Sequence, residues 1–536
     1  MVETDREVRR SPARLALTTA LATASALLVV LYMLSPPRWE TNDDVAMSMV
    51  THGYGIAAPG APPYLMFSNV LWGYMARSIP AFGGLLGYST ATIGALSIAC
   101  AAVTYGMLRL GAGCVPSLAA AGLLFVRPML FPQFTVNAGM LMVAAAILWC
   151  VHSVERPAWA LAASALLALL SYLIRSQECL LVLAVALPLL SWRPLRSRRV
   201  QGVLLAVCCA IAAAAIFDHR AYQAKEWQEF NALNPVRARL TDFRAGESLR
   251  KRPDIVERHG YSLNDVALME KWFFVDPGIA DPVKLDAMLA EAGPLPRQDH
   301  AWANALISLK ALGHPSLWVF VVVGVLGAML RPSRGLFMAW AIFLAAIVAM
   351  GFLGRPGIIR VYLPVVSLLA IAPLLQRTSA GSVRNRALCA VLLLAAAANA
   401  FNVLSESRST NTADAHARAR VAGFPDYPVV IWGGGFPFEA VYPVLGASQT
   451  VLDYKLYGLG VSTLAPFSVA RAEDRAGRGM IARLLAGEGV PLVASDEEIR
   501  LLGVYCREHH GGQLQQTERP LKAGGGPSRY RCVQGR

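Results

Sequence analysis

The sequence has 536 residues, of which 55% are hydrophobic and only 16% are charged, and its formal net charge is +14. Soluble domains average about 25% charged residues, so the low charge and the long apolar runs argue against an ordinary soluble core and favour a membrane protein. Nucleic-acid binding is disfavoured because there is no basic stripe with interleaved aromatics and no recognised binding motif. We interpret the arginines between apolar runs as topology signals.

The first apolar stretch, from Leu15 to Leu34, follows a basic region that contains Arg6, Arg9 and Arg10. A signal peptide has the same order of features, but its apolar core is roughly 7–15 residues long and ends at a small-residue cleavage site. This stretch is longer and no such site follows it. We therefore predict a retained first membrane helix.

Eleven segments have the apolar character of membrane-spanning helices, each of which needs about 20 residues. Their expected positions are residues 15–35, 84–109, 114–131, 137–153, 158–174, 177–192, 199–217, 314–331, 335–353, 361–376 and 386–404. Segment 64–80 contains Asn69, Arg77 and Pro80, and we expect it to lie at the membrane interface. The predicted fold is a membrane all-α, polytopic bundle of about eleven transmembrane helices, followed by a small α/β domain.

The orientation follows from the basic links between these segments. A cytoplasmic N-terminus places inside the arginine-rich links near Arg109 and at residues 193–199, 331–334 and 377–386, as the positive-inside rule requires. The segments then expected outside are residues 36–83, 132–136, 175–176, 218–313, 354–360 and 405–536.

The predicted domains are a transmembrane domain, residues 1–404, and an extracytoplasmic α/β domain, residues 405–536. The long outer loop at 218–313 is expected to carry structure of its own. In it, Ser262 is a predicted cap of a helix running to Phe274, and a second helix starts at Asp281-Pro282 and ends near Gly293-Pro294.

In the tail we predict strands at Val429–Trp432, Pro491–Ser495 and Tyr530–Val533, and a helix that Ser495 caps and whose first turn is acidic. The glycines 433–435 indicate a tight turn, since the Lys-Ser/Thr of a phosphate loop is missing. Cys506 and Cys532 either form a disulfide, if the tail lies outside the cytoplasm, or are two unpaired thiols. There is no CxxC pair, which disfavours a metal or redox site.

An acidic segment just after the first helix carries the first candidate site residues. It places three carboxylates within five residues at a membrane face and is followed by a histidine and a tyrosine; the candidates are Glu40, Asn42, Asp43, Asp44, His52 and Tyr54. Such carboxylates are either solvated loop residues or a general base, whose pKa a neighbouring acid would raise.

Arginines at the outer ends of helices form the second group: Arg127, Arg175, Arg355 and Arg360, with Glu178 and Tyr362 close to them in sequence. Outer arginines run against the positive-inside bias, and the planar guanidinium matches phosphate oxygens. Snorkelling to lipid headgroups is the alternative explanation for any one of them.

This order of features resembles the C-type (GT-C) glycosyltransferases: a first helix, an outer loop with paired acids, interfacial helices and about ten further spans. The run Arg360-Val361-Tyr362-Leu363-Pro364 is similar to the Arg-Tyr-x-x-Pro run of some members, with a valine inserted. The resemblance implies that a sugar is transferred from a polyprenyl-phosphate carrier. It also implies that Asp43 or Asp44 is the catalytic base and that Arg175, Arg355 or Arg360 binds the carrier phosphate.

The same resemblance implies a multi-pass protein of the bacterial inner (plasma) membrane. Its partners would be the polyprenyl-phosphate-linked sugar, a glycan or lipid acceptor and membrane lipids. The predicted substrate-binding residues are Glu40, Asn42, His52, Tyr54, Arg127, Arg175, Glu178, Arg355, Arg360 and Tyr362. The sequence has neither a DxD motif nor the oligosaccharyltransferase signature, so a divalent metal cofactor stays an open question.

Two other classes share part of this pattern. An O-antigen ligase or polymerase also has about a dozen spans and a large outer loop, and it would rely on loop residues such as His219, His259 and His300. A transporter or flippase would need no covalent chemistry, but transporters usually show internal repeats, and we find none in this sequence.

Overall fold

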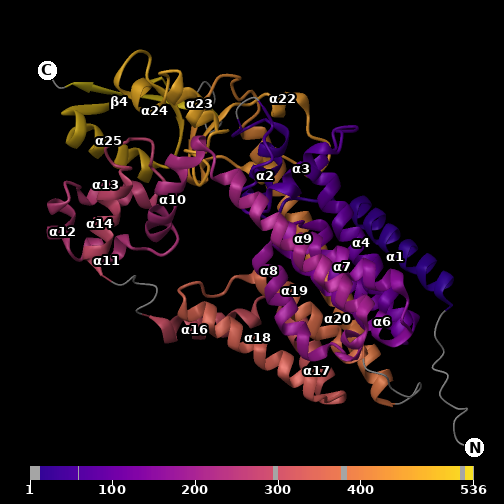
Figure 1. Ribbon diagram of the computed structural model, residues 1–536. Coiled ribbons are helices and arrows are strands. Elements are labelled where there is room, and N and C mark those ends of the chain that lie inside the picture. Colours follow the sequence, from indigo (N-terminus) through magenta and orange to yellow (C-terminus); the bar gives the residue numbers. More distant parts are fainter. Residues whose placement is uncertain (1–11, 58–59, 294–299, 376–382, 519–525, 535–536) are drawn as a thin grey trace, which may run out of the picture. The chain divides into compact units, whose positions relative to one another are not determined.

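The computed structural model describes residues 12–57, 60–293, 300–375, 383–518 and 526–534. The basic residues Arg6, Arg9 and Arg10, the expected helix end at Pro294 and residues 377–382 of a basic link lie outside this part of the chain. The chain divides into two compact units (Figure 1). The first comprises residues 1–44, 64–218 and 302–411, and the second comprises residues 45–63, 219–301 and 412–536.

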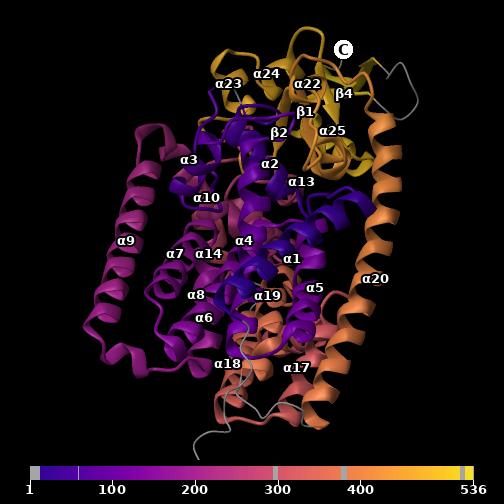
Figure 2. The same cartoon turned by 90° about the vertical axis from the view of Figure 1, so that its right-hand side faces the viewer.

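Helices build the first unit (Figures 1 and 2). They are α1 (Ala13–Leu34), α3 (Val70–Ser78), α4 (Gly87–Leu110), α5 (Cys114–Leu130), α6 (Phe134–Glu155), α7 (Ala158–Ile174), α8 (Ser176–Ala186), α9 (Arg198–Tyr222), α16 (Ala301–Lys310), α17 (Trp318–Leu330), α18 (Arg334–Phe352) and α19 (Ile359–Ile371). Short 3-10 helices are η1 (Leu187–Leu189), η2 (Arg193–Arg196), η4 (Ala311–Gly313) and η5 (Ala372–Leu375). Three helices, α2 (Asn42–His52), α9 and α20 (Val383–Arg420), continue from the first unit into the second.

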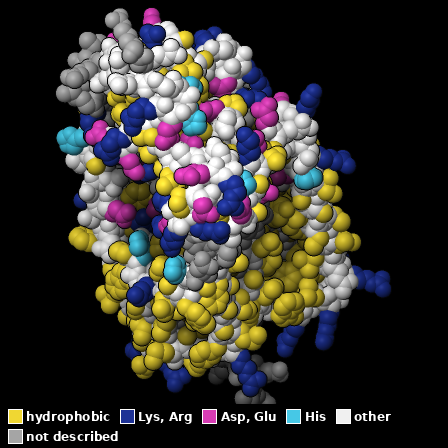
Figure 3. Space-filling model, turned by 90° about the vertical axis from the view of Figure 1, so that its left-hand side faces the viewer, with side chains coloured by type: hydrophobic (Ala, Val, Ile, Leu, Met, Phe, Trp, Pro, Cys, Tyr) yellow, Lys and Arg dark blue, Asp and Glu magenta, His cyan; other side chains and the backbone are white. Residues whose placement is uncertain are grey.

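Several of these helices have the length and composition of membrane spans. Within the described residues, six are long and apolar enough to cross a membrane: α1, α4, α6, α9, α18 and α20. A seventh span results if α16 and α17, bent by 86° at their junction, are taken as one. On the face shown in Figure 3, hydrophobic side chains cover a broad area with Lys and Arg at its lower edge. The described chain is thus largely helical, and several of its helices could span a membrane.

Helix α6 is the central element of the first unit. It is almost entirely buried and packs against α4, α7, α8 and α19. The approach of α19 is close at Gly139, where an added Cβ would lie 2.3 Å from Cβ of Pro364. Helix α9 is the opposite case, because only Val200 and Ala214 are buried on it. Its other side chains are exposed or partly exposed.

The segment expected at the interface forms the nine-residue helix α3. At about 1.5 Å per residue it is about 14 Å long, too short for a hydrocarbon core of about 30 Å. Its start is tied to two other helices: the Ser68 hydroxyl donates to the Ile174 carbonyl at the end of α7, and the Asn69 amide donates to the Ala214 carbonyl of α9. The segment is therefore tied to the end of α7 and to the second half of α9.

The second unit contains a five-stranded sheet of order β2-β1-β3-β5-β4. Strands β2 and β3 are parallel to β1, and β5 runs antiparallel to β3 and β4. The strands are β1 (Val429–Trp432), β2 (Leu456–Leu459), β3 (Val490–Val493), β4 (Gly512–Glu518) and β5 (Ser528–Gln534). The three predicted strands correspond to β1, β3 and β5, and the expected turn at residues 433–435 is a short 3-10 helix, η6 (Gly433–Gly435).

The second unit also contains short helices from two parts of the sequence. Those of segment 219–301 are η3 (Lys225–Trp227), α10 (Gln228–Thr241), α11 (Gly246–Arg250), α12 (Pro253–Arg258), α13 (Leu263–Glu270) and α14 (Pro282–Ala292). Those of the C-terminal segment are α21 (Phe438–Val441), α22 (Gln449–Leu452), α23 (Val469–Arg475), α24 (Met480–Leu485) and α25 (Asp496–His510). The two predicted caps are present, because Ser262 and Ser495 each form a capping box. Asp281, where the second helix of the loop was expected to start, caps α14.

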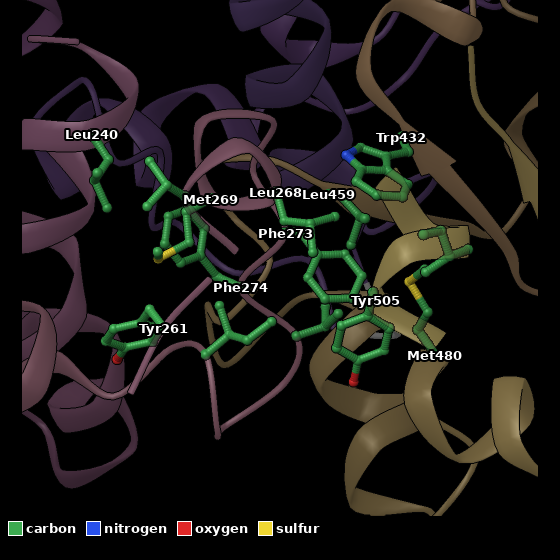
Figure 4. Close-up of a cluster of buried hydrophobic side chains, with 14 of the residues drawn as sticks. Leu240, Tyr261, Leu268, Met269, Phe273, Phe274, Trp432, Leu459, Met480 and Tyr505 are labelled. Atoms are coloured by element: carbon green, nitrogen blue, oxygen red, sulfur yellow. The ribbon is translucent and has the colours of Figure 1, made fainter. Parts of the chain in front are cut away.

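The two segments share one hydrophobic core (Figure 4). Phe273, from segment 219–301, contacts the rings of Trp432 and Tyr505, and the Trp432 indole donates to the Lys271 carbonyl. This packing explains why residues 219–301 group with the C-terminal segment, whereas the sequence placed them with the membrane domain.

A disulfide joins Cys506 of α25 to Cys532 of β5, as one of the two sequence interpretations expected. Its two cysteines are 26 positions apart in sequence, so the chain-entropy model gives the disulfide about 3.5 kcal/mol of stabilisation. Replacing both cysteines by serine should lower the midpoint of thermal unfolding of the purified chain. Cys208→Ser, at an exposed free cysteine on α9, is the control and should leave the midpoint unchanged. An equal midpoint in the double variant would contradict the prediction.

Candidate active site

Asp43 and Arg360 form an ion pair although 317 positions separate them in sequence. Asp43 lies in the first turn of α2, where the positive end of the helix dipole stabilises a carboxylate. Its Oδ2 accepts a hydrogen bond from Nη1 of Arg360, in the first turn of α19, at 2.9 Å. The side chains are 26% and 37% exposed, so both are open to a ligand.

Arg175 lies at the junction of α7 and α8, where the chain leaves one helix and begins the next. Its Nη1 donates to the Phe67 carbonyl at 3.1 Å. The guanidinium carbon lies 5.3 Å from the centre of the Phe134 ring and 6.0 Å from that of Phe67. Two aromatic rings and one carbonyl therefore fix the orientation of this cation.

Several predicted site residues act electrostatically on Arg175. Burial lowers the pKa of Arg175, and the nearby positive charge of Arg360 lowers it further, whereas Asp43 and Glu178 raise it and Arg355 lowers it. The structure therefore brings together four charged residues from three separate stretches of the chain. They are the partly exposed carboxylate of Asp43 and the arginines at positions 175, 355 and 360.

Asp44, the neighbour of Asp43, has a different environment. Its side chain is fully buried, and its carboxylate accepts hydrogen bonds from the Tyr88 hydroxyl and the Phe134 amide, both at 3.0 Å, and from the Thr41 hydroxyl at 3.3 Å. Burial raises the pKa of Asp44 well above its ordinary value, and the charge of Asp43 adds to this shift. Asp44 therefore links α2 to α4 and α6, and Asp43 is the acid that faces the open site.

Arg127 and Glu40, both predicted to bind substrate, pair with each other. Arg127 Nη2 donates to Glu40 at 2.8 Å, and Nη1 donates to Glu406 of α20 at 2.7 Å. The guanidinium also lies 5.1 Å from the centre of the Phe131 ring. Two carboxylates thus already neutralise this arginine, which leaves it poorly suited to a carrier phosphate.

We expect Arg127→Gln to destabilise the chain, because Glu40 and Glu406 would then face each other without a cation. Removing one partner of a buried ion pair costs about 3–5 kcal/mol, and we expect about 1–3 kcal/mol here because both carboxylates are partly exposed. The measurement is the thermal unfolding midpoint in detergent. Glu406→Gln, which leaves the pair with Glu40 intact, should have the smaller effect, and equal midpoints for all three proteins would refute this role.

Arg355 lies in a tight turn just before α19, and Arg360 lies in the first turn of that helix. Gly354 and Gly357 both have positive φ, at 78° and 70°, which favours glycine at these positions. The Gly357 amide donates to the hydroxyl of Tyr362, whose side chain is fully buried. The buried Tyr362 therefore stabilises the turn through this hydrogen bond. Arg355, in the same turn, is exposed.

Glu178 is buried in the first turn of α8. Its Cγ lies against α6 at Gly139, where an added Cβ would be 3.2 Å away. Its Oε1 has no hydrogen-bond partner among the described residues. Glu178 therefore lies in the buried contact between α8 and α6, beside Arg175 at the start of α8.

The remaining predicted residues lie at the two ends of α2. Asn42 is exposed at the start of the helix. His52 and Tyr54 belong to the second unit, where the Tyr54 hydroxyl donates to Ser48 at 2.9 Å and its ring packs 5.5 Å from that of Tyr442. The hydrogen bond to Ser48 and the ring contact with Tyr442 give Tyr54 a packing role.

A metal ion would need clustered ligands. Among the described residues, the group whose ligand atoms lie close enough together is Asp265, Glu508 and His509, all in the second unit. At the candidate active site, Arg360 already supplies a positive charge to Asp43.

Sequence reasoning missed Phe67, Phe134, Tyr88 and Glu406, which position the predicted residues. Three of these residues lie in helices, Tyr88 in α4, Phe134 in α6 and Glu406 in α20, and Phe67 lies just before α3, so no local pattern connects them without the fold. The resulting arrangement can accept a proton at Asp43 and bind an anion at Arg175, Arg355 and Arg360. No protein-family model, curated protein or solved structure matches this chain.

Proposed function

We propose that this chain is a membrane glycosyltransferase of the GT-C type. It moves a sugar from a polyprenyl-phosphate carrier to an acceptor hydroxyl on the outer face of the membrane. The observation that carries the proposal is the meeting of Asp43 with Arg360 and Arg175, residues that come from α2, α19 and the α7–α8 junction.

The reaction follows from the chemistry of these groups. The donor phosphate binds at the arginines and draws Arg360 away from Asp43, which frees the carboxylate to accept the proton of an acceptor hydroxyl. That oxygen attacks the anomeric carbon with inversion, and the bond from this carbon to the phosphate oxygen breaks. The departing polyprenyl phosphate gains one negative charge, which Arg175, Arg355 and Arg360 stabilise.

The proposal includes eleven membrane spans. The six long helices, the bent pair α16–α17 and the four shorter apolar helices together make this number; the shorter ones are Cys114–Leu130, Ala158–Ile174, Ser176–Leu189 and Ile359–Leu375. Their positions follow the eleven apolar segments of the sequence.

The proposed orientation has a cytoplasmic N-terminus and an extracytoplasmic second unit. It is supported by the Cys506–Cys532 disulfide, since disulfides persist in oxidising compartments. It is also supported by the exposed arginines of the α8–α9 link, which the positive-inside rule assigns to the cytoplasm: Arg193, Arg196, Arg198 and Arg199. A bacterial inner membrane with a polyprenyl-phosphate-linked sugar and a glycan or lipid acceptor fits this arrangement.

The proposal is tested with the purified full chain in liposomes that contain polyprenyl-phosphate sugars labelled in the sugar. A glycosyltransferase cleaves the bond between the sugar and the phosphate and makes a covalent product with the acceptor. Movement of the intact labelled carrier across the bilayer, without cleavage, would instead identify a transporter.

A further inference from the structure

The second unit contains a cavity of about 430 Å³ that the proposed reaction does not use. Helix α10 and the segment after α13 form one wall, and α23 and α24 form the other. The lining includes Glu229, Phe274, Leu464, Arg471, Asp474 and Ile481. Ligand sites in proteins are commonly about 300–1,000 Å³, so the volume suits a small ligand or one unit of a polymer.

Asp474 is the first polar group that the cavity offers. Its Oδ1 accepts a hydrogen bond from the Tyr457 hydroxyl at 2.8 Å. The carboxylate also needs the glycine at position 479, because an added Cβ there would lie 2.0 Å from Oδ1. Its Oδ2 accepts no hydrogen bond from any described residue, and burial raises the pKa of Asp474. One oxygen is therefore fixed and the other can receive a donor from a ligand.

Arg471 is the second polar group. It lies three residues before Asp474 on α23, so the two side chains share one face of the helix. Its guanidinium forms an ion pair with Glu229 of α10, on the opposite wall. A guanidinium has five N–H donors, and Arg471 can hydrogen-bond a ligand beside Asp474 while it keeps Glu229.

The charges and the apolar walls decide the class of ligand. Glu229 and Asp474 carry two negative charges against the one positive charge of Arg471, which disfavours a phosphate or any other anion. Phe274, Leu464 and Ile481 give apolar contact. A sugar ring fits this combination, because its hydroxyls both donate and accept hydrogen bonds and its C–H groups form an apolar face.

We propose that this cavity binds an uncharged sugar unit of the acceptor, so that the second unit recognises a glycan. This inference rests on the proposed glycosyl transfer, and it names the acceptor class. The ring would lie between Phe274 on one wall and Ile481 on the other, and adjacent hydroxyls would bind Asp474 and Arg471.

Ligand-observed NMR on the purified full chain tests the cavity directly. The probes are the methyl glycosides of neutral hexoses, N-acetylhexosamines, deoxyhexoses and pentoses, together with an unglycosylated peptide. We expect at least one glycoside to bind. Ala482→Trp, at an exposed lining position, should fill the cavity and weaken binding about tenfold or more. Ala486→Trp, exposed at the end of α24 and outside the lining, is the matched control and should bind like the unchanged chain.

A second variant probes the chemistry without added bulk. Asp474→Asn should also weaken glycoside binding about tenfold, whereas Asp453→Asn, at an exposed carboxylate outside the cavity, should not. Binding of no glycoside, binding that Ala482→Trp and Asp474→Asn leave unchanged, or binding of the peptide alone would overturn the inference. Glycoside binding by a chain that transfers no sugar would overturn the proposed reaction and leave the cavity assignment standing.

Discussion

Asp43→Asn is expected to abolish sugar transfer while the chain remains folded and inserted. The amide keeps the size of the side chain and its place in the first turn of α2, but it cannot accept the proton of the acceptor hydroxyl. General-base catalysis contributes about 10²- to 10⁴-fold in rate. Because Asp43 is partly exposed and its side chain pairs with Arg360 at the open site, its replacement removes little packing.

The measurement is the rate of covalent product formation in liposomes with saturating donor and acceptor. Thermal unfolding and protease accessibility of the same preparation report on folding and insertion. Asp426→Asn, at an exposed carboxylate of the second unit, should retain full activity. Full activity in Asp43→Asn would remove the assignment of the base. Loss of activity in a variant of His259 instead would favour the ligase class.

Asp44→Ala is expected to have the opposite phenotype, a loss of folded protein. The alanine would leave the buried Tyr88 hydroxyl and the Phe134 amide without their acceptor, at about 1–3 kcal/mol for each unsatisfied donor. We therefore expect the free energy of unfolding to fall by about 2–5 kcal/mol. A loss of this size reduces the yield of inserted protein and lowers its unfolding midpoint.

Asp44→Asn is the matched variant for this position. Its amide oxygen can still accept from Tyr88 and Phe134, and burial already favours the uncharged form of Asp44. It should therefore be clearly more stable than Asp44→Ala, as measured by thermal unfolding at neutral pH. An Asp44→Ala chain as stable as the unchanged one, but inactive, would show that the two neighbouring acids have exchanged their expected roles.

Local sequence patterns predicted much of the fold. Apolar length marked the helices α1, α4 and α6, and the polar residues around Asn69 indicated that α3 does not cross the membrane. The start of α13 could be predicted because Ser262 lies three residues before Asp265, the spacing of a capping box. These signals depend on a few neighbouring residues, so they can be recognised without knowledge of the tertiary structure.

The missed parts of the sheet have identifiable causes. Strand β4 is a sheet edge whose residues are mostly exposed and polar, so it has no apolar pattern. Strand β2 is four residues long and includes Gly458, which weakens a strand pattern. Helix α20 runs to Arg420, whereas the apolar stretch was predicted to end at residue 404. The prediction stopped early because the later turns of this helix are polar.

The candidate site could be predicted only in part, because the roles depend on contacts that are distant in sequence. Nothing local distinguishes Asp43 from Asp44; the difference arises from Tyr88 and Phe134, which bury one of them. The ion pair of Arg127 depends on Glu406, which is 279 positions away.

A structure of the chain with bound polyprenyl phosphate would test the central claim most directly. We predict that the phosphate lies within hydrogen-bonding distance of Arg175 and Arg360, and that Arg360 no longer pairs with Asp43. A phosphate bound elsewhere, with the Asp43–Arg360 pair intact, would contradict the assignment of this site.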